Sequence, residues 1–168
     1  MMYIERWWGN YIGGTDDTCT LIDYFVDREF ESDNPTEINV KNILQDFQLN
    51  NTLEIKDLRQ TKGIYLIIEK EFFQDIGCVI NLLIDVTAII LECQKNGKVY
   101  LTDLAGGIMD KNAVISLKVG KEEMAFLRRV LEDFIHHPLS YDLAEFCPED
   151  DMRKIAKICK EIIEELNM

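Results

Sequence analysis

One apolar stretch constrains this chain more than any other feature. Residues 76–93 read IGCVINLLIDVTAIILEC, with only four polar interruptions at Asn81, Asp85, Thr87 and Glu92. Asp85 lies near the middle of the stretch, and an aspartate at that depth in a bilayer is strongly disfavoured. The stretch is therefore predicted to form the buried centre of a fold that does not enter the membrane.

The secondary structure of this stretch has two interpretations. In the first, a strand over residues 77–83 leads into a helix over residues 85–95, with Asp85 as N-cap and Gly97 just past the helix end. In the second, one continuous helix starts at Ile76. Because periodicity does not separate a short buried strand from a buried helix, both interpretations stay open.

The size and composition of the chain predict one domain over residues 1–168. A chain of 168 residues, 47% hydrophobic and 29% charged, is long enough to bury a core without metals or disulfides. The five cysteines are scattered singly, which predicts buried free thiols. No signal-peptide pattern opens the sequence, so we expect a cytoplasmic protein.

The spacing of apolar residues divides the remaining segments into predicted strands and predicted helices. Alternation predicts strands at residues 2–12, 53–58, 64–70, 98–104 and 113–119, with 53–58 and 64–70 as a hairpin. Helical periodicity predicts a helix from Thr15 to about residue 28, and others over residues 35–49, 120–137 and 148–166. The expected fold is a single α+β domain, in which a central helix and two C-terminal helices pack against a mostly antiparallel sheet.

The negative charge of the chain is concentrated near its N-terminus. The net charge is −13, and residues 16–37 contain eight acidic residues against a single base, Arg28. Nucleic acid is not expected as a partner, because phosphate contacts need a basic surface. A basic protein is the partner that such a surface favours, since opposite charges speed encounter.

An aromatic segment stands directly before these acids. If helices cover both faces of the predicted N-terminal strand, its rings belong to the core; otherwise an exposed tryptophan beside the acids is typical of a protein-binding hot spot. The residues predicted to bind a protein partner are Trp7, Trp8, Tyr11, Asp16, Asp17, Asp23, Asp27, Glu29, Glu31 and Asp33.

The common catalytic and cofactor signatures are absent from the sequence. It contains no H-E-x-x-H, no G-x-S-x-G and no nucleotide-binding glycine motif. His136 and His137 are adjacent and diverge on a helix, so neither a metal nor a cofactor is predicted. Two alternatives to a binding protein stay open: a homodimeric interaction domain, and a small-molecule enzyme that uses Asp16, Asp17 and Asp85.

The N-terminal segment also carries a family resemblance. Residues 7–17 read WWGNYIGGTDD and belong to an acidic α+β chain with unpaired cysteines. This combination resembles the small cytosolic immunity proteins that bacteria encode beside polymorphic or contact-dependent toxins. The resemblance implies tight, non-catalytic binding of one cognate toxin, often a basic nuclease whose active site the acidic surface blocks. It implies no particular binding residues.

Overall fold

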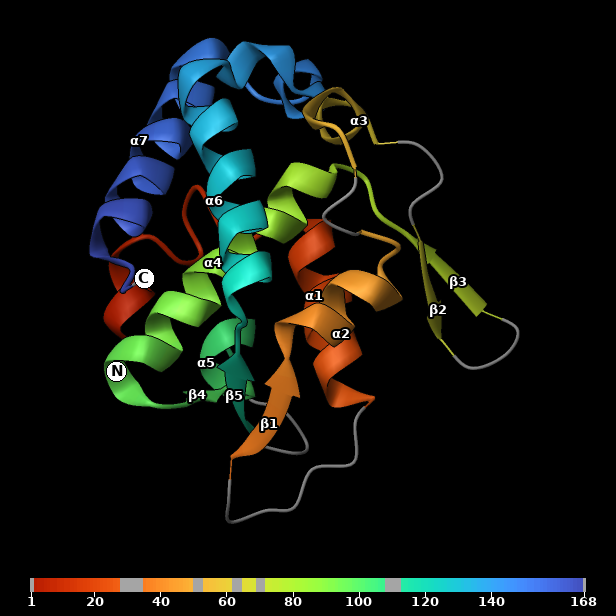
Figure 1. The fold of residues 1–168 in the computed structure, drawn as a ribbon, viewed down its shortest axis with the longest axis vertical. Coiled ribbons are helices and arrows are strands. Elements are labelled where there is room, and N and C mark those ends of the chain that lie inside the picture. Colours follow the sequence, from red (N-terminus) through yellow and green to blue (C-terminus); the bar gives the residue numbers. More distant parts are fainter. Residues whose placement is uncertain are drawn as a thin grey trace.

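The fold is built around one central helix. The computed structural model describes residues 2–27, 35–49, 53–61, 65–68, 72–107 and 113–167. Helix α4 (Val79–Asn96) lies in the middle of the molecule, and all its side chains from Val79 to Cys93 are buried except Asn81 (Figure 1). It packs against the helices α1 (Asp16–Val26), α3 (Ile55–Arg59), α6 (Lys121–His136) and α7 (Glu149–Glu165).

The apolar stretch is therefore one helix, as the second interpretation proposed, although it begins at Val79 rather than Ile76. The strand expected over residues 77–83 is wrong, and Asp85 lies inside the helix instead of capping it. The predicted end is confirmed, because Gly97 follows the last helical residue with a φ of +79°. A left-handed residue at this position is common because it closes the last helical turn, and glycine adopts it without strain.

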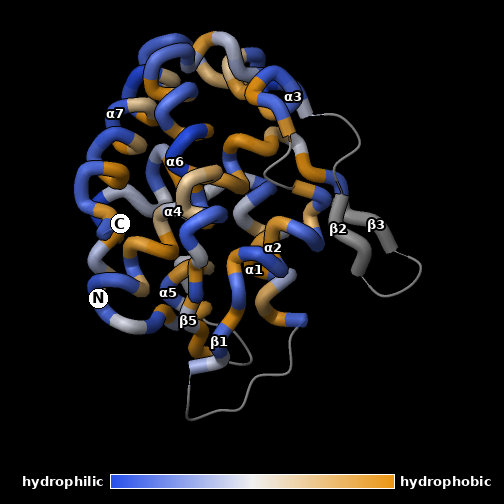
Figure 2. The backbone as a smooth tube through the Cα atoms, viewed as in Figure 1, coloured by the Kyte–Doolittle hydropathy of each residue, from blue (hydrophilic) through white to orange (hydrophobic). Residues whose placement is uncertain are grey.

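The three predicted amphipathic helices α1, α6 and α7 are confirmed. Thr15 caps α1 through a reciprocal pair of hydrogen bonds with Thr18. α6 ends at His136, just before Pro138, and α7 begins at Glu149 directly after Pro148. Figure 2 shows the hydrophilic residues of α7 along the outer edge of the molecule and its hydrophobic residues toward the inside.

The strands form two small sheets, so the α+β class is confirmed. In the first sheet β5 (Val114–Lys118) lies between β1 (Thr36–Asn39) and the two-residue β4 (Val99–Tyr100). β1 runs parallel to β5, and β4 runs antiparallel to it. In the second sheet β2 (Tyr65–Ile68) pairs antiparallel with β3 (Phe72–Asp75). The expected single sheet is thus divided, and one of its three pairings is parallel.

Several short segments differ from their predicted structure. Residues 53–58 contain α3 rather than a strand, and β2 pairs with β3 instead. Residues 35–49 contain β1 and α2 (Val40–Asp46) rather than one helix. Residues 98–104 contain β4 and the start of α5 (Leu101–Ala105). In segments this short, pairing with distant partners such as β5 outweighs local propensity.

The N-terminal segment is not a strand. Residues 3–6 form the 3₁₀ turn η1 (Tyr3–Arg6), and a tight turn follows in which the Gly9 amide donates to the Ile12 carbonyl at 2.7 Å. η1 packs on α4, where the Tyr3 amide donates to the Glu92 carboxylate at 3.1 Å. The segment also reaches α7, since Tyr3 and Arg6 both bind Glu165. The two ends of the chain therefore lie close together (Figure 1).

Candidate functional site

Two aspartates predicted as site residues hold the N-terminal segment to α4. Asp85 is 1% exposed; its carboxyl accepts hydrogen bonds from the Gly13 amide at 3.1 Å and from the Thr18 hydroxyl at 2.5 Å. Asp17 is 5% exposed and accepts from the amides of Gly77 and Cys78 at 2.7 and 2.9 Å. Burial raises the pKa of Asp85 to about 7, although both hydrogen bonds oppose the rise. Both carboxyls therefore have structural partners.

This arrangement does not support the alternative of a small-molecule enzyme that uses Asp16, Asp17 and Asp85. That hypothesis required two of the carboxylates Asp16, Asp17 and Asp85 to converge in a concave pocket. Asp16 is exposed, whereas Asp17 and Asp85 are buried and hydrogen-bonded to backbone and side chains. The described part of the chain also contains no group of three or more histidine, cysteine or acidic side chains that could hold a metal ion.

The two tryptophans are buried, so of the two alternatives the core position is confirmed and the exposed tryptophan is not found. Trp7 is 5% exposed, and its indole nitrogen donates to Glu161 of α7 at 3.0 Å. Trp8 is 9% exposed, and its indole nitrogen donates to the Leu104 carbonyl of α5 at 2.9 Å. A strand would have turned the two rings to opposite faces, but here helices cover both. Each indole has its polar group satisfied within the chain.

Of the aromatic residues in the N-terminal segment, Tyr3 and Tyr11 are exposed at the surface. Tyr11 is the one that was predicted to bind a partner. It is 38% exposed, and its hydroxyl accepts a hydrogen bond from Lys154 of α7 at 3.0 Å. The ammonium group of Lys154 also lies 5.3 Å from the centre of the Tyr11 ring. Tyr11 thus lies at the border between the N-terminal segment and α7.

Three of the predicted acids lie on the outer surface of α1. Asp16, Asp23 and Asp27 are exposed, and we call them the α1 acidic surface. Partial burial and the neighbouring Asp27 carboxylate raise the pKa of Asp23. Val26 is 41% exposed on the same helix. The remaining predicted acids, Glu29, Glu31 and Asp33, lie outside the described residues.

A hollow of about 410 Å³ lies beside the α1 acidic surface, between α1 and α5. Its lining is mostly backbone, hydroxyl and aliphatic groups, with Asp23 as the one acidic side chain; it consists of Gly13, Gly14, Thr15, Thr18, Cys19, Ile22, Asp23, Leu104 and Ala105. The φ of Gly13 is +73°, and a Cβ there would lie 2.2 Å from the Trp8 ring. The wall of the hollow therefore depends on the absence of a side chain at residue 13.

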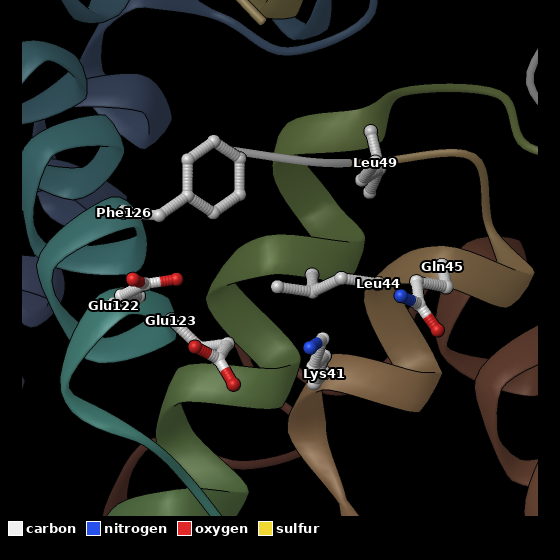
Figure 3. A pocket seen from close by; sticks show the side chains of 7 residues that line it. All are labelled: Lys41, Leu44, Gln45, Leu49, Glu122, Glu123 and Phe126. Atoms are coloured by element: carbon white, nitrogen blue, oxygen red, sulfur yellow. The ribbon is translucent and has the colours of Figure 1, made fainter. Parts of the chain in front are cut away.

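A second, smaller cavity of about 110 Å³ lies between α2 and α6 (Figure 3). Leu44, Leu49 and Phe126 form its apolar floor, while Glu122 and Glu123 stand on one side and Lys41 on the other. The cavity is well below the 300 Å³ or more that is typical of small-molecule sites.

The three buried cysteines are poorly suited to react as nucleophiles. All five are free thiols, and burial raises the pKa of Cys78 to about 12 and also raises that of Cys93 and Cys159. A raised pKa lowers the thiolate fraction and thus the reactivity. Cys19 is exposed and Cys147 half-buried, so the prediction of buried thiols is wrong for these two residues.

Two apolar residues were missed by the sequence analysis. Phe146 is 74% exposed and Leu139 is 45% exposed, and both lie in the connection between α6 and α7. The only local signal was that Phe146 belongs to no helical stripe and stands beside Glu145 and shortly before Pro148.

None of the described helices is long and apolar enough to cross a membrane.

The comparisons with known proteins identify the class to which this small α+β chain belongs. The chain matches a family of immunity proteins, and it is therefore one of them. The family is Immunity protein 68, whose model matches residues 3–166, and the chain belongs to that family. Membership supports a general role in neutralising a toxin and implies a cognate toxin as partner. Neither the curated proteins nor the solved structures compared with the chain gave a match.

Proposed function

We propose that this protein acts in the cytoplasm without catalysis, by binding one cognate toxin and covering its active site. The family match over residues 3–166 carries this proposal. It is supported by the roles of Asp17 and Asp85, which are buried and hydrogen-bonded within the fold rather than presented in a pocket.

The α1 acidic surface is the part of the molecule that we assign to electrostatic recognition. Asp16, Asp23 and Asp27 are exposed on one helix, and the chain as a whole has a net charge of −13. A partner with a basic cleft, such as a nuclease, would be attracted along this surface. The carboxylates would then occupy the positions that the phosphates of the toxin's own substrate require.

The apolar contact in this proposal comes from Tyr11 and Val26 rather than from the tryptophans. Trp7 and Trp8 are buried and their indole nitrogens are bonded within the chain, whereas Tyr11 and Val26 are 38% and 41% exposed. Trp7 and Trp8 serve the interface indirectly, because they hold the N-terminal segment against α5 and α7.

A triple charge reversal tests the proposal. We expect Asp16→Lys, Asp23→Lys and Asp27→Lys together to lower the association rate with the toxin domain encoded by the adjacent open reading frame by at least about tenfold at low salt. The salt dependence of the rate should also become flatter, because fewer favourable charges act at a distance. Surface plasmon resonance at several ionic strengths measures both quantities.

The matched control reverses three exposed acids elsewhere, Glu5, Glu132 and Glu164, and so changes the net charge by the same amount. This variant should lose less of the association rate than the α1 variant. Equal losses would show that only the net charge matters and would remove the α1 acidic surface from the proposal. A wild-type chain that neither binds that toxin nor protects cells expressing it would remove the proposed function itself.

A further inference from the structure

The connection between α6 and α7 presents the most exposed large apolar side chain among the described residues. Phe146 is 74% exposed, and Leu139, in the same connection, is 45% exposed. We call residues 137–148 the α6–α7 turn. It contains the 3₁₀ turns η2 (Pro138–Ser140) and η3 (Asp142–Glu145). Single exposed apolar residues are ordinary, but here two stand on one short connection, and we call these two residues the patch.

The contacts that hold the α6–α7 turn in place come from residues other than Phe146 and Leu139. Tyr141 is 2% exposed; its ring packs edge-on against Phe134 at 5.1 Å and its hydroxyl donates to Asp133 at 2.7 Å. Arg59 of α3 donates two hydrogen bonds to the same Asp133 carboxylate, at 2.7 and 3.0 Å. Asp142 accepts from the Thr61 amide at 2.8 Å.

The turn is therefore organised before any partner arrives. Because the backbone that carries Phe146 is already ordered, less conformational freedom is lost on binding, which favours affinity. Large aromatic side chains at the centre of an interface, surrounded by polar residues, are also the side chains that contribute most to binding.

Acidic residues surround the patch and indicate the chemistry of its partner. Glu145, Glu149 and Asp150 are exposed next to Phe146 in the sequence, and Glu149 is paired with Arg153. A second copy of this chain would bring the same acids against one another. A partner with basic residues around an apolar pocket fits this surface better.

The α6–α7 turn also leads directly into α7, the helix that Tyr11 contacts. Tyr11 binds Lys154 of α7 at 3.0 Å. This hydrogen bond raises the pKa of Lys154, and the nearby carboxylates Asp151 and Asp150 contribute to the rise. Asp150 and Asp151 stand in the first turn of α7, directly after the α6–α7 turn. Tyr11 thus contacts the N-terminal half of the helix that Phe146 shortly precedes in the chain.

We propose that Phe146 is an apolar anchor of the toxin interface, inserted into a pocket on the toxin that basic residues surround, with Leu139 beside it. This inference rests on the proposed function, because its partner is the cognate toxin. It adds a specific contact surface that lies outside the α1 acidic surface.

The test compares Phe146→Ala with the wild-type full chain in binding to the purified toxin domain from the adjacent open reading frame. We expect Phe146→Ala to weaken the affinity by about 30-fold or more, mainly through faster dissociation. Phe146→Tyr, which keeps the ring, should bind within a few-fold of wild type. Calorimetry gives the affinity and surface plasmon resonance gives the two rates.

The matched control is Tyr100→Ala, which removes a 37% exposed ring on β4, at the opposite end of the molecule from the turn (Figure 1). It should leave the affinity unchanged, and the unfolding midpoint in urea should stay the same for Phe146→Ala. If wild type and Phe146→Ala bind the toxin equally, the anchor is refuted while the proposed function stands. If light scattering shows a dimer that Phe146→Ala dissociates, the patch joins two copies and the inference is refuted as well.

Discussion

Asp85 shows how far the chemistry of one residue depends on its surroundings. Asp85 belongs to α4 and is 1% exposed, and its carboxyl accepts hydrogen bonds from the Gly13 amide and the Thr18 hydroxyl. Water is excluded there, so the charged form is disfavoured and the pKa rises from 3.8 to about 7. In the unfolded chain the same group is solvated and titrates near its ordinary value.

We expect this residue to make the protein less stable as the pH rises from about 4 to about 7. In that range the folded chain keeps a proton on Asp85 that the unfolded chain has released, so raising the pH favours unfolding. The difference between a pKa of 3.8 and one of about 7 corresponds to at most about 4 kcal/mol in the free energy of unfolding. Urea unfolding followed by circular dichroism at pH 5 and pH 8 measures this decrease.

Asp85→Asn separates this contribution from that of other titrating groups. The amide keeps an acceptor for the Gly13 amide and has no proton to lose, so the decrease in stability between pH 5 and pH 8 should shrink. The control is Asp16→Asn, which changes an exposed acid of α1. This variant should show the same decrease in stability between pH 5 and pH 8 as the wild type. An unchanged decrease in Asp85→Asn would assign the pH dependence to other groups.

At the scale of the element, α4 begins at Val79 because other elements supply its N-terminal acceptors. Asp17 of α1 accepts from the amides of Gly77 and Cys78, and the Thr61 hydroxyl accepts from the Val79 amide at 2.8 Å. These amides would otherwise lack helical partners. Local patterns predict Asp85 as the cap, because most caps lie directly before the helix that they cap. Asp17 lies about 60 residues earlier in the chain, so local patterns could not reveal it.

Asp17→Ala should therefore destabilise the protein by about 2 to 4 kcal/mol, because it leaves buried amide donors unpaired. The neighbouring substitution Asp16→Ala removes an exposed carboxylate from the same helical turn and should lower the free energy of unfolding by less than about 1 kcal/mol. Urea unfolding of both variants at one pH gives the comparison. Equal losses would mean that Asp17 acts through the dipole of α1 rather than through α4.

The long helices were predicted correctly from the sequence, whereas several short elements were not. α1, α6 and α7 have several helical turns, so their apolar residues recur often enough to define one buried face. β1, α3 and α5 have four or five residues each, which is too short for a period to be recognised. Their structure is decided by neighbours such as β5, which binds β1 along its length.

At the scale of the whole molecule, one hydrophobic core connects the N-terminal segment to the last helix. The same cluster of buried residues includes Ile4, Trp8, residues of α4, and Leu166. α4 packs against elements from both ends of the chain, from η1 and α1 to α6 and α7. This continuity supports the proposal that residues 1–168 form a single domain.

We expect the chain to unfold in one cooperative transition. Tryptophan fluorescence reports the contacts of Trp7 and Trp8 with α7 and α5, whereas circular dichroism reports all the helices. The two signals should give the same midpoint in urea. An earlier fluorescence midpoint would show that the N-terminal segment unfolds separately and that the domain has two cooperative parts.

The sequence by itself determined that most of residues 76–93 are buried, where the amphipathic helices lie, and that the class is α+β. These features follow from composition and from periods that each segment contains within itself. Only the tertiary structure decided that Asp17 and Asp85 join α1 to α4, that both tryptophans are covered, and that Phe146 is exposed. The physical reason is that a period shows which face of a segment is apolar, whereas exposure and hydrogen-bond partners depend on what distant parts of the chain place against that face.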